Sequence, residues 1–192
     1  DRSRRGPASD FLAQEEAFEP MRLEIAGRPH LTYCTNIHPG ETWIEIRRNL
    51  EQYVLRVRDN VAHHCAFGIG LRLSGQAARE LSQPNTLSDF HTFLKDHNLY
   101  VFTINGFPHG AFHGARIKEQ VYLPDWLDEE RLHYADQLAH ILTALLTDHS
   151  DIDGSISTVP GAFKPRVRSP GDVSVIAGRL LQHAATLHQL KE

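Results

Sequence analysis

Residues 99–126 read LYVFTINGFPHGAFHGARIKEQVYLPDW, and the interpretation of the rest of the chain starts from them. The segment opens with aromatic and β-branched side chains, a composition typical of a strand that is buried on both faces. It turns polar at Asn105 and continues for about 20 residues without helical or strand periodicity, which in a compact domain indicates a functional loop. Phe107 and Trp126 argue against disorder. We therefore expect an ordered lid or binding loop at the carboxyl end of a parallel strand.

The composition is that of an ordinary domain. The 192 residues are 41% hydrophobic and 23% charged, enough for one domain with a sizeable core. No apolar run approaches the roughly 20 residues of a bilayer helix, and no signal peptide is recognisable, so we expect a cytoplasmic protein. The formal net charge of −4 argues against a nucleic-acid partner. Cys34 and Cys65 are too far apart for a CxxC motif, and we expect both to be buried, reduced thiols.

After an amino-terminal extension of residues 1–21, which we expect to be flexible, strand-like and helix-like runs alternate through residues 22–192. The strand-like runs cover residues 30–37, 67–74, 99–105 and 154–159. Five helices are expected between and after these strands. The first begins with a capping box of Thr42 and Glu45, the second is a short run at 76–81, and the third is capped by Thr86 and Asp89 and ends at Asn98. The fourth begins near Asp128, and the last is capped by Asp172 and carries an apolar stripe that should face inward.

Alternation of this kind predicts a parallel sheet with right-handed crossovers, which can form either a doubly wound sheet or a barrel. Eight βα units need about 250 residues, so the chain would hold half a barrel. Polar side chains follow every strand-like run, and that distribution favours the barrel, whose enzymes use this face. We predict an α/β, TIM-barrel-like fold consisting of the first four units of a (β/α)8 barrel. Its open edges and its barrel-facing apolar side chains should favour self-association.

Four motifs together resemble one family. HLTYCTNIHPGETW (30–43), FGIGLRLS (67–74), the segment 99–126 and GSISTVPGAFKP (154–165) are similar to the amino-terminal half of the EboE-type metabolite traffic proteins. That family belongs to the xylose isomerase-like TIM-barrel superfamily, and the resemblance covers about residues 22–190. It implies a longer family member whose later strands would bind a divalent metal, so we expect no cofactor in this chain.

The resemblance implies a protein that binds a small metabolite, prenylated or hydroxylated, at the barrel mouth and acts in its transfer toward the cytoplasmic membrane, together with other proteins of the same gene cluster. The alternative is a metal-dependent sugar-phosphate isomerase or epimerase whose metal site lies in the missing half. A structural subunit that pairs with another half-barrel is a third interpretation. Whether any reaction is catalysed stays open, since a fold does not fix chemistry.

Four residues at strand ends lead the candidates for substrate binding, each beside a simpler role. Asn105 has the best claim, with a turn residue as the alternative. Asn36 and His38 can orient a hydroxyl or carbonyl group, and His38 can equally cap the next helix. Arg72 can hold a phosphate or carboxylate in a bidentate manner, or form an ion pair with Glu119 inside the barrel.

The loop after residue 105 supplies the remaining candidates for substrate binding. His109 and His113 stand four apart, but glycines break the segment and the HExxH order is absent, so we assign no metal site to them. Lys118 and Glu119 can form an acid/base pair or a solvated ion pair. The histidines at 63, 64, 140, 183 and 188 are interpreted as surface residues.

Overall fold

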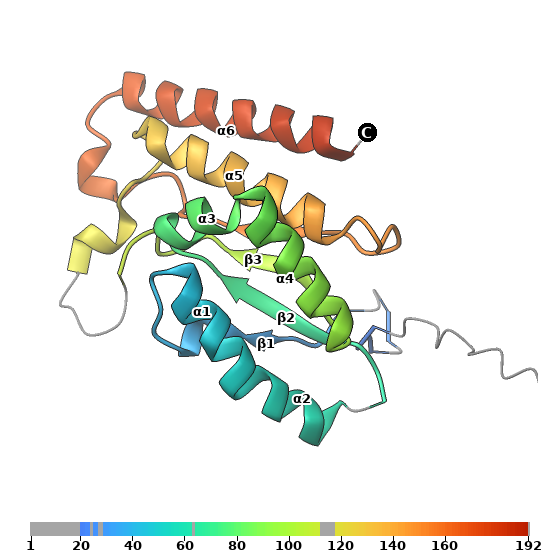
Figure 1. Cartoon of the computed structure of the whole chain (residues 1–192). Coiled ribbons are helices and arrows are strands. Elements are labelled where there is room, and N and C mark those ends of the chain that lie inside the picture. Colours follow the sequence, from blue (N-terminus) through green and yellow to red (C-terminus); the bar gives the residue numbers. More distant parts are fainter. Residues whose placement is uncertain (1–19, 24, 27–28, 63, 112–117, 192) are drawn as a thin grey trace, which may run out of the picture.

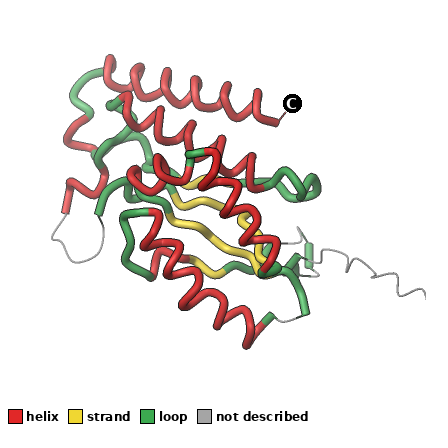
Figure 2. Tube along the Cα trace, viewed as in Figure 1, coloured by secondary structure: helices red, strands yellow, loops and turns green. Residues whose placement is uncertain are grey.

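The computed structural model describes residues 20–23, 25–26, 29–62, 64–111 and 118–191, which form an α/β fold around a parallel sheet (Figure 1). Figure 2 shows the strands lying side by side behind the helices. The sheet has four strands in the order β1-β2-β3-β4, all of them parallel. Their bounds are β1 Tyr33–Cys34, β2 Phe67–Arg72, β3 Leu99–Asn105 and β4 Ser155–Ser157. The predicted strand order is confirmed, and β1 and β4 are the edges of this sheet.

The helices follow the strands in the alternation that the sequence predicts. Their bounds are α1 Trp43–Asn49, α2 Leu55–Val61, α3 Gly75–Leu81, α4 Pro84–Asp96, α5 Glu129–Leu145 and α6 Pro170–Lys191. A π-helical segment joins α1 to α2 without a break. Leu50, Phe90 and Leu138, from three parts of the helical layer, pack with Ile69 and Val101 of the sheet in one core. The helices from α1 to α5 therefore cover the same face of the sheet (Figure 1).

A β-bulge in β3 decides which side chains reach the opposite, open face. The pairing of β2 with β3 slips after Ile69, so that Gly70 pairs with Thr103 and Phe102 becomes the extra residue. Bulges re-aim side chains in this way. The side chains of the open face then form two rows across the strands: Cys34, Gly70, Thr103 and Ser155, and two residues further on Arg72, Asn105 and Ser157.

These two rows of the open face consist of small or polar side chains, whereas the rings of Tyr100 and Phe102 lie next to Gly68 at the other end of the face. Ser155 Oγ donates to Thr103 Oγ1 at 2.9 Å, and an added Cβ at Gly70 would contact Cys34 Sγ and Thr32 Oγ1. Among the described residues, exposed large apolar side chains occur before β2, at Leu123 and on α6, but not on β2, β3 or β4. Within the described chain, an exposed apolar patch is therefore not found on β2, β3 or β4, although Leu31 and Ile37 of the predicted 30–37 strand are exposed; self-association stays a prediction.

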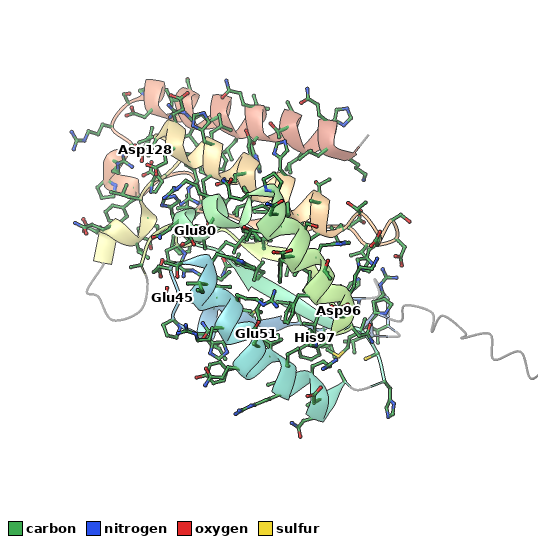
Figure 3. The ribbon with its side chains drawn as sticks, in the orientation of Figure 1. Glu45, Glu51, Glu80, Asp96, His97 and Asp128 are labelled. Carbon is green, nitrogen blue, oxygen red and sulfur yellow. The ribbon has the colours of Figure 1, made fainter. Side chains whose placement is uncertain are left out.

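The local predictions have mixed outcomes. The capping box of Thr42 and Glu45 is confirmed, and Trp43 N also donates to Glu80 Oε2 of α3 at 2.6 Å (Figure 3 labels Glu45 and Glu80). The caps at Thr86 and Asp89 are wrong because α4 begins earlier, with a proline in its first turn. The 30–37 strand shortens to two residues, since a 3₁₀ turn follows Cys34.

Two burial predictions fail. The stripe expected to face inward on α6 buries none of its residues, because α6 packs mainly against α5 and leaves Val173 and Leu187 exposed. Cys34 is exposed rather than buried, since β1 is a short edge strand, while Cys65 is half-buried; both are free thiols. Residues 1–19, most of the predicted extension, lie outside the described residues. Within the part of the chain described, no helix combines the length and apolarity needed to cross a membrane.

Candidate functional site

The carboxyl ends of the strands enclose a cavity of about 290 Å³. Its lining comes from all four βα units: Asn36, Arg72, Asn105, Phe107, Pro108, Ser157 and Thr158. In open parallel sheets, ligands bind outside the carboxyl ends of the strands. The structure thus brings together three residues that the sequence placed at strand ends, Asn36, Arg72 and Asn105. It also adds Ser157, which ends β4, and Thr158, which follows it.

Arg72 is the buried centre of this site, with 3% of its surface exposed. Its Nη1 and Nη2 donate to Glu41 Oε1 and Oε2 at 3.0 and 3.3 Å, a bidentate ion pair. The same two nitrogens also donate to the carbonyl oxygens of Gly40 and Gly110, at 2.7 and 2.8 Å. The pairing with Glu119 that the sequence left open is therefore wrong, because Glu41 lies beside the guanidinium and neutralises it.

One nitrogen of Arg72 remains without a partner. Nε is buried and makes no hydrogen bond to the described residues. The backbone N–H of Arg72 donates to Thr35 Oγ1 at 2.9 Å, and that hydroxyl is itself buried. Sequence reasoning missed Thr35 and Glu41. The signal available for Thr35 was its position directly after the first strand, next to Asn36, whereas Glu41 lies later in the loop before α1 and had no such signal.

Asn105 and Ser157 are joined across neighbouring strands. Ser157 Oγ donates to Asn105 Oδ1 at 2.7 Å, and Phe107 N donates to the same oxygen at 3.3 Å. This fixes the amide orientation, so Nδ2 becomes the group that can donate to a ligand, and it has no hydrogen bond within the described chain. Phe107 also closes an Asx-type turn with Asn105, so the turn role and the site role coincide.

His38 and His109 do not line this cavity. His38 Nε2 lies 2.7 Å from Tyr33 Oη, and its ring stacks on Tyr53 with centroids 4.4 Å apart. His109 lies edge-on to the ring of Tyr134 at 4.7 Å, and its Nε2 is 3.7 Å from Glu130 Oε1. Burial lowers the pKa of His109. Both histidines therefore belong to the packing beside the site, although the sequence assigned them to substrate binding.

The remaining loop candidates are not brought into the cavity. His113 lies outside the described residues. Glu119 is exposed in a 3₁₀ turn spanning Lys118–Tyr122, and the side chain of Lys118 is outside the description, so the acid/base pair stays a prediction. Among the residues described, no three His, Cys, Asp or Glu side chains gather in a group that could hold a metal ion.

His183 departs from its predicted surface role. Its Nδ1 lies 2.6 Å from Asp136 Oδ1, and only 12% of the histidine side chain is exposed. The pair joins α6 to α5. Helical periodicity could not reveal it, because the two residues are 47 positions apart.

Comparisons with known proteins do not identify a family for this chain. No protein-family model matches it, and no curated protein or solved structure does so either. Inference about function therefore depends on the residues and the geometry described above.

Proposed function

We propose that this chain is a metabolite-binding protein that holds a small, neutral, hydroxylated molecule in the cavity at the carboxyl ends of its strands. The observation that carries the proposal is the row of Arg72, Asn105 and Ser157, which register places side by side on the open face. Asn105 Nδ2 offers a donor, and Ser157 Oγ offers an acceptor. A few convergent polar groups beside an apolar wall are typical of small-molecule sites.

The preference for a neutral ligand follows from the charges. The guanidinium of Arg72 is already paired with Glu41 and bonded to backbone carbonyls, so a phosphate or carboxylate would have to displace the ion pair. Phe107 and Pro108 supply the apolar wall of the cavity, against which the C–H face of a polyol can lie. A pentose matches these requirements better than a phosphorylated sugar.

The parallel sheet with its helices on one face supports the interpretation as a TIM-type half-barrel with this cavity at its mouth. The EboE-type role, binding a metabolite for transfer toward the cytoplasmic membrane, is our proposal for the biological setting, and a cytoplasmic location belongs to it. It is supported by the sequence motifs, because Asn36, Arg72, Asn105 and Ser157 all fall within or at the end of those motifs.

The test is a titration of the chain with D-xylose, followed by two-dimensional NMR. We expect saturable shifts of the Asn105 side-chain amide, and about tenfold weaker binding in Asn105→Ala, the loss of roughly one hydrogen bond. Asn85→Ala, which removes an exposed amide on α4, is the matched control and should bind like the wild type. Xylose binding unchanged by Asn105→Ala, or tighter binding of xylose 5-phosphate, would contradict the proposal.

A further inference from the structure

A second and larger cavity, of about 830 Å³, lies between α5, α6 and β4. One end is lined by Arg131, Trp126 and Tyr134, close to the start of α5. Aliphatic side chains from all three elements line much of the rest: Leu138, Leu142, Leu146, Ile156, Leu180 and Leu187. Polar and charged side chains line it as well, among them Thr143, Thr147, Asp153, His183 and Lys191. Between Arg131 and Leu146 the helix rises about 22 Å. The cavity is therefore an elongated groove with a large aliphatic share in its wall and a buried cation, Arg131, at one end.

Arg131 is a buried cation that forms no direct ion pair within the described chain, although the carboxylates of Asp125, Asp128 and Glu130 act on it from a distance and raise its pKa. It is 1% exposed; its Nε donates to Pro124 O at 2.7 Å, and its Nη1 donates to Gly106 O at 2.8 Å. Its Nη2 is buried and has no hydrogen-bond partner among the described residues. Burial lowers the pKa of Arg131, yet a guanidinium keeps its proton at neutral pH.

Two of the three acidic residues that act on Arg131 are bound by another arginine, and the third, Glu130, lies 3.7 Å from His109 Nε2. Asp125 is fully buried and Asp128 lies at the start of α5, and both carboxylates are bound by Arg166 (Figure 3 labels Asp128). No ion pair joins Arg131 to a carboxylate within the described chain. A buried charge left uncompensated is strongly unfavourable, and a carboxylate that accepts a hydrogen bond from Nη2 would remove that penalty.

We propose that this groove binds an amphiphilic carboxylate of the fatty-acid type, with its head group on Arg131 and its alkyl chain along the aliphatic side chains of α5 and α6. The charge of the head group complements the guanidinium of Arg131, which has no ion pair among the described residues; Lys191 is the other cation of the lining. The alkyl chain covers Leu180 and Leu187, which are 39% and 43% exposed in the free chain. His183, held by Asp136, fixes α6 over the groove.

Trp126 makes the binding measurable, since it lines the groove and is fully buried. Trp43 is the other tryptophan among the two in the chain, so Trp43→Phe leaves Trp126 as the sole reporter. We titrate this variant with dodecanoate below its micellar concentration and, separately, with dodecanol. Dodecanoate should give a saturable change in Trp126 fluorescence. Dodecanol, which lacks the charge, should bind at least tenfold more weakly.

Two pairs of variants separate the head group from the chain. Arg131→Met should abolish the preference for dodecanoate over dodecanol, whereas Arg168→Met, an exposed change of the same net charge, should preserve it. Leu180→Asp places a charge in the path of the alkyl chain and should weaken dodecanoate binding more than tenfold. Leu181→Asp, one residue further along α6 and 70% exposed, should leave it unchanged. Because Leu180 is not a core residue, this second pair remains informative if Arg131→Met fails to fold.

Equal affinity for dodecanoate and dodecanol in the wild type, or unchanged binding in folded Leu180→Asp, would overturn the proposal. A stable dimer by light scattering that excludes dodecanoate would also overturn it and assign the groove to a second copy of the chain. Asn105→Ala should not affect dodecanoate binding, so the failure of this proposal and the failure of the xylose site are distinguishable.

Discussion

Arg72 and Arg131 are both buried guanidinium groups near the carboxyl end of the sheet, but their surroundings differ. Arg72 ends β2 and is bonded to the Glu41 carboxylate as well as to backbone carbonyls. Arg131 lies in the first turn of α5 and is bonded to two carbonyls only, with no carboxylate partner among the described residues. A direct ion pair neutralises the first arginine inside the fold, whereas the second is offset only from a distance, by Asp125, Asp128 and Glu130.

This difference separates a structural arginine from one that is available to a ligand. The Arg72 ion pair joins the β1–α1 loop to the end of β2 and to the loop after β3, so it shapes a cavity that is electrically neutral. Arg131 holds the Gly106 and Pro124 carbonyls in place and still presents a charge without a direct ion pair in the described chain beside the groove. Burial alone would not distinguish the two, since their exposed fractions are 3% and 1%.

The largest effect should come from Arg72→Met. The change leaves Glu41 and several buried carbonyl oxygens without their donor, so we expect a loss of about 3–5 kcal/mol in the free energy of unfolding. Urea denaturation followed by far-ultraviolet circular dichroism measures it. Arg79→Met, an exposed arginine on α3, is the control and should stay within about 0.5 kcal/mol of the wild type. A loss below 1 kcal/mol in Arg72→Met would show that the ion pair is not part of the stabilising framework.

Arg131→Met should lower the free energy of unfolding by less than Arg72→Met does, by about 1–2 kcal/mol in the same urea assay. Two carbonyl oxygens lose their donor, but the substitution also removes a buried charge that has no direct ion pair in the described chain, and the second effect offsets part of the first. The informative quantity is the ratio of the two losses in the free energy of unfolding, that of Arg72→Met to that of Arg131→Met. Equal losses would indicate that Arg131 is compensated as fully as Arg72.

The sequence predicts the part of the site that depends on strand ends. Composition marks Leu99–Asn105 as a strand, and the parallel alternation places Asn36, Arg72 and Asn105 at one edge, as the structure confirms. The bulge at Phe102 is not predictable in the same way. In a run of consecutive apolar residues, an extra residue leaves no trace in the period, yet it decides that Thr103 and Asn105 face the open side.

The sequence also could not show which groups pair with or pack against one another in the fold. Glu41 and Glu119 are both loop carboxylates, and no local pattern says which of them reaches Arg72; the structure selects Glu41. A helical period likewise shows that α6 has an apolar stripe without showing what covers it, and α6 buries none of its residues. Arg131 escaped attention because an arginine in the first turn of a helix is usually solvated.

The smallest expected effect is a change in the pKa of His109, because the charges of both Arg131 and Arg72 lower that pKa. Burial is the main reason that its pKa lies below the ordinary value of 6.5; Glu130 acts in the opposite direction, and Arg131 lowers the pKa more than Arg72 does. The pKa of His109 should therefore rise in Arg131→Met and rise less in Arg72→Met. NMR titration of the His109 ring, with His140 on the exposed face of α5 as an internal reference, measures both changes.

The same shift links His109 to stability. Because the folded state holds this histidine at a lowered pKa, the unfolded chain binds more protons between the folded pKa and 6.5. Stability from the buried neutral ring is complete above pH 6.5 and is lost as the pH falls through this window. Urea midpoints at pH 7.5 and 5.5 should thus differ less in His109→Gln than in the wild type, while His133→Gln, an exposed change on α5, should retain the wild-type difference. A difference that is unchanged in His109→Gln would place the acid sensitivity on His30 and His149, whose pKa values burial also lowers.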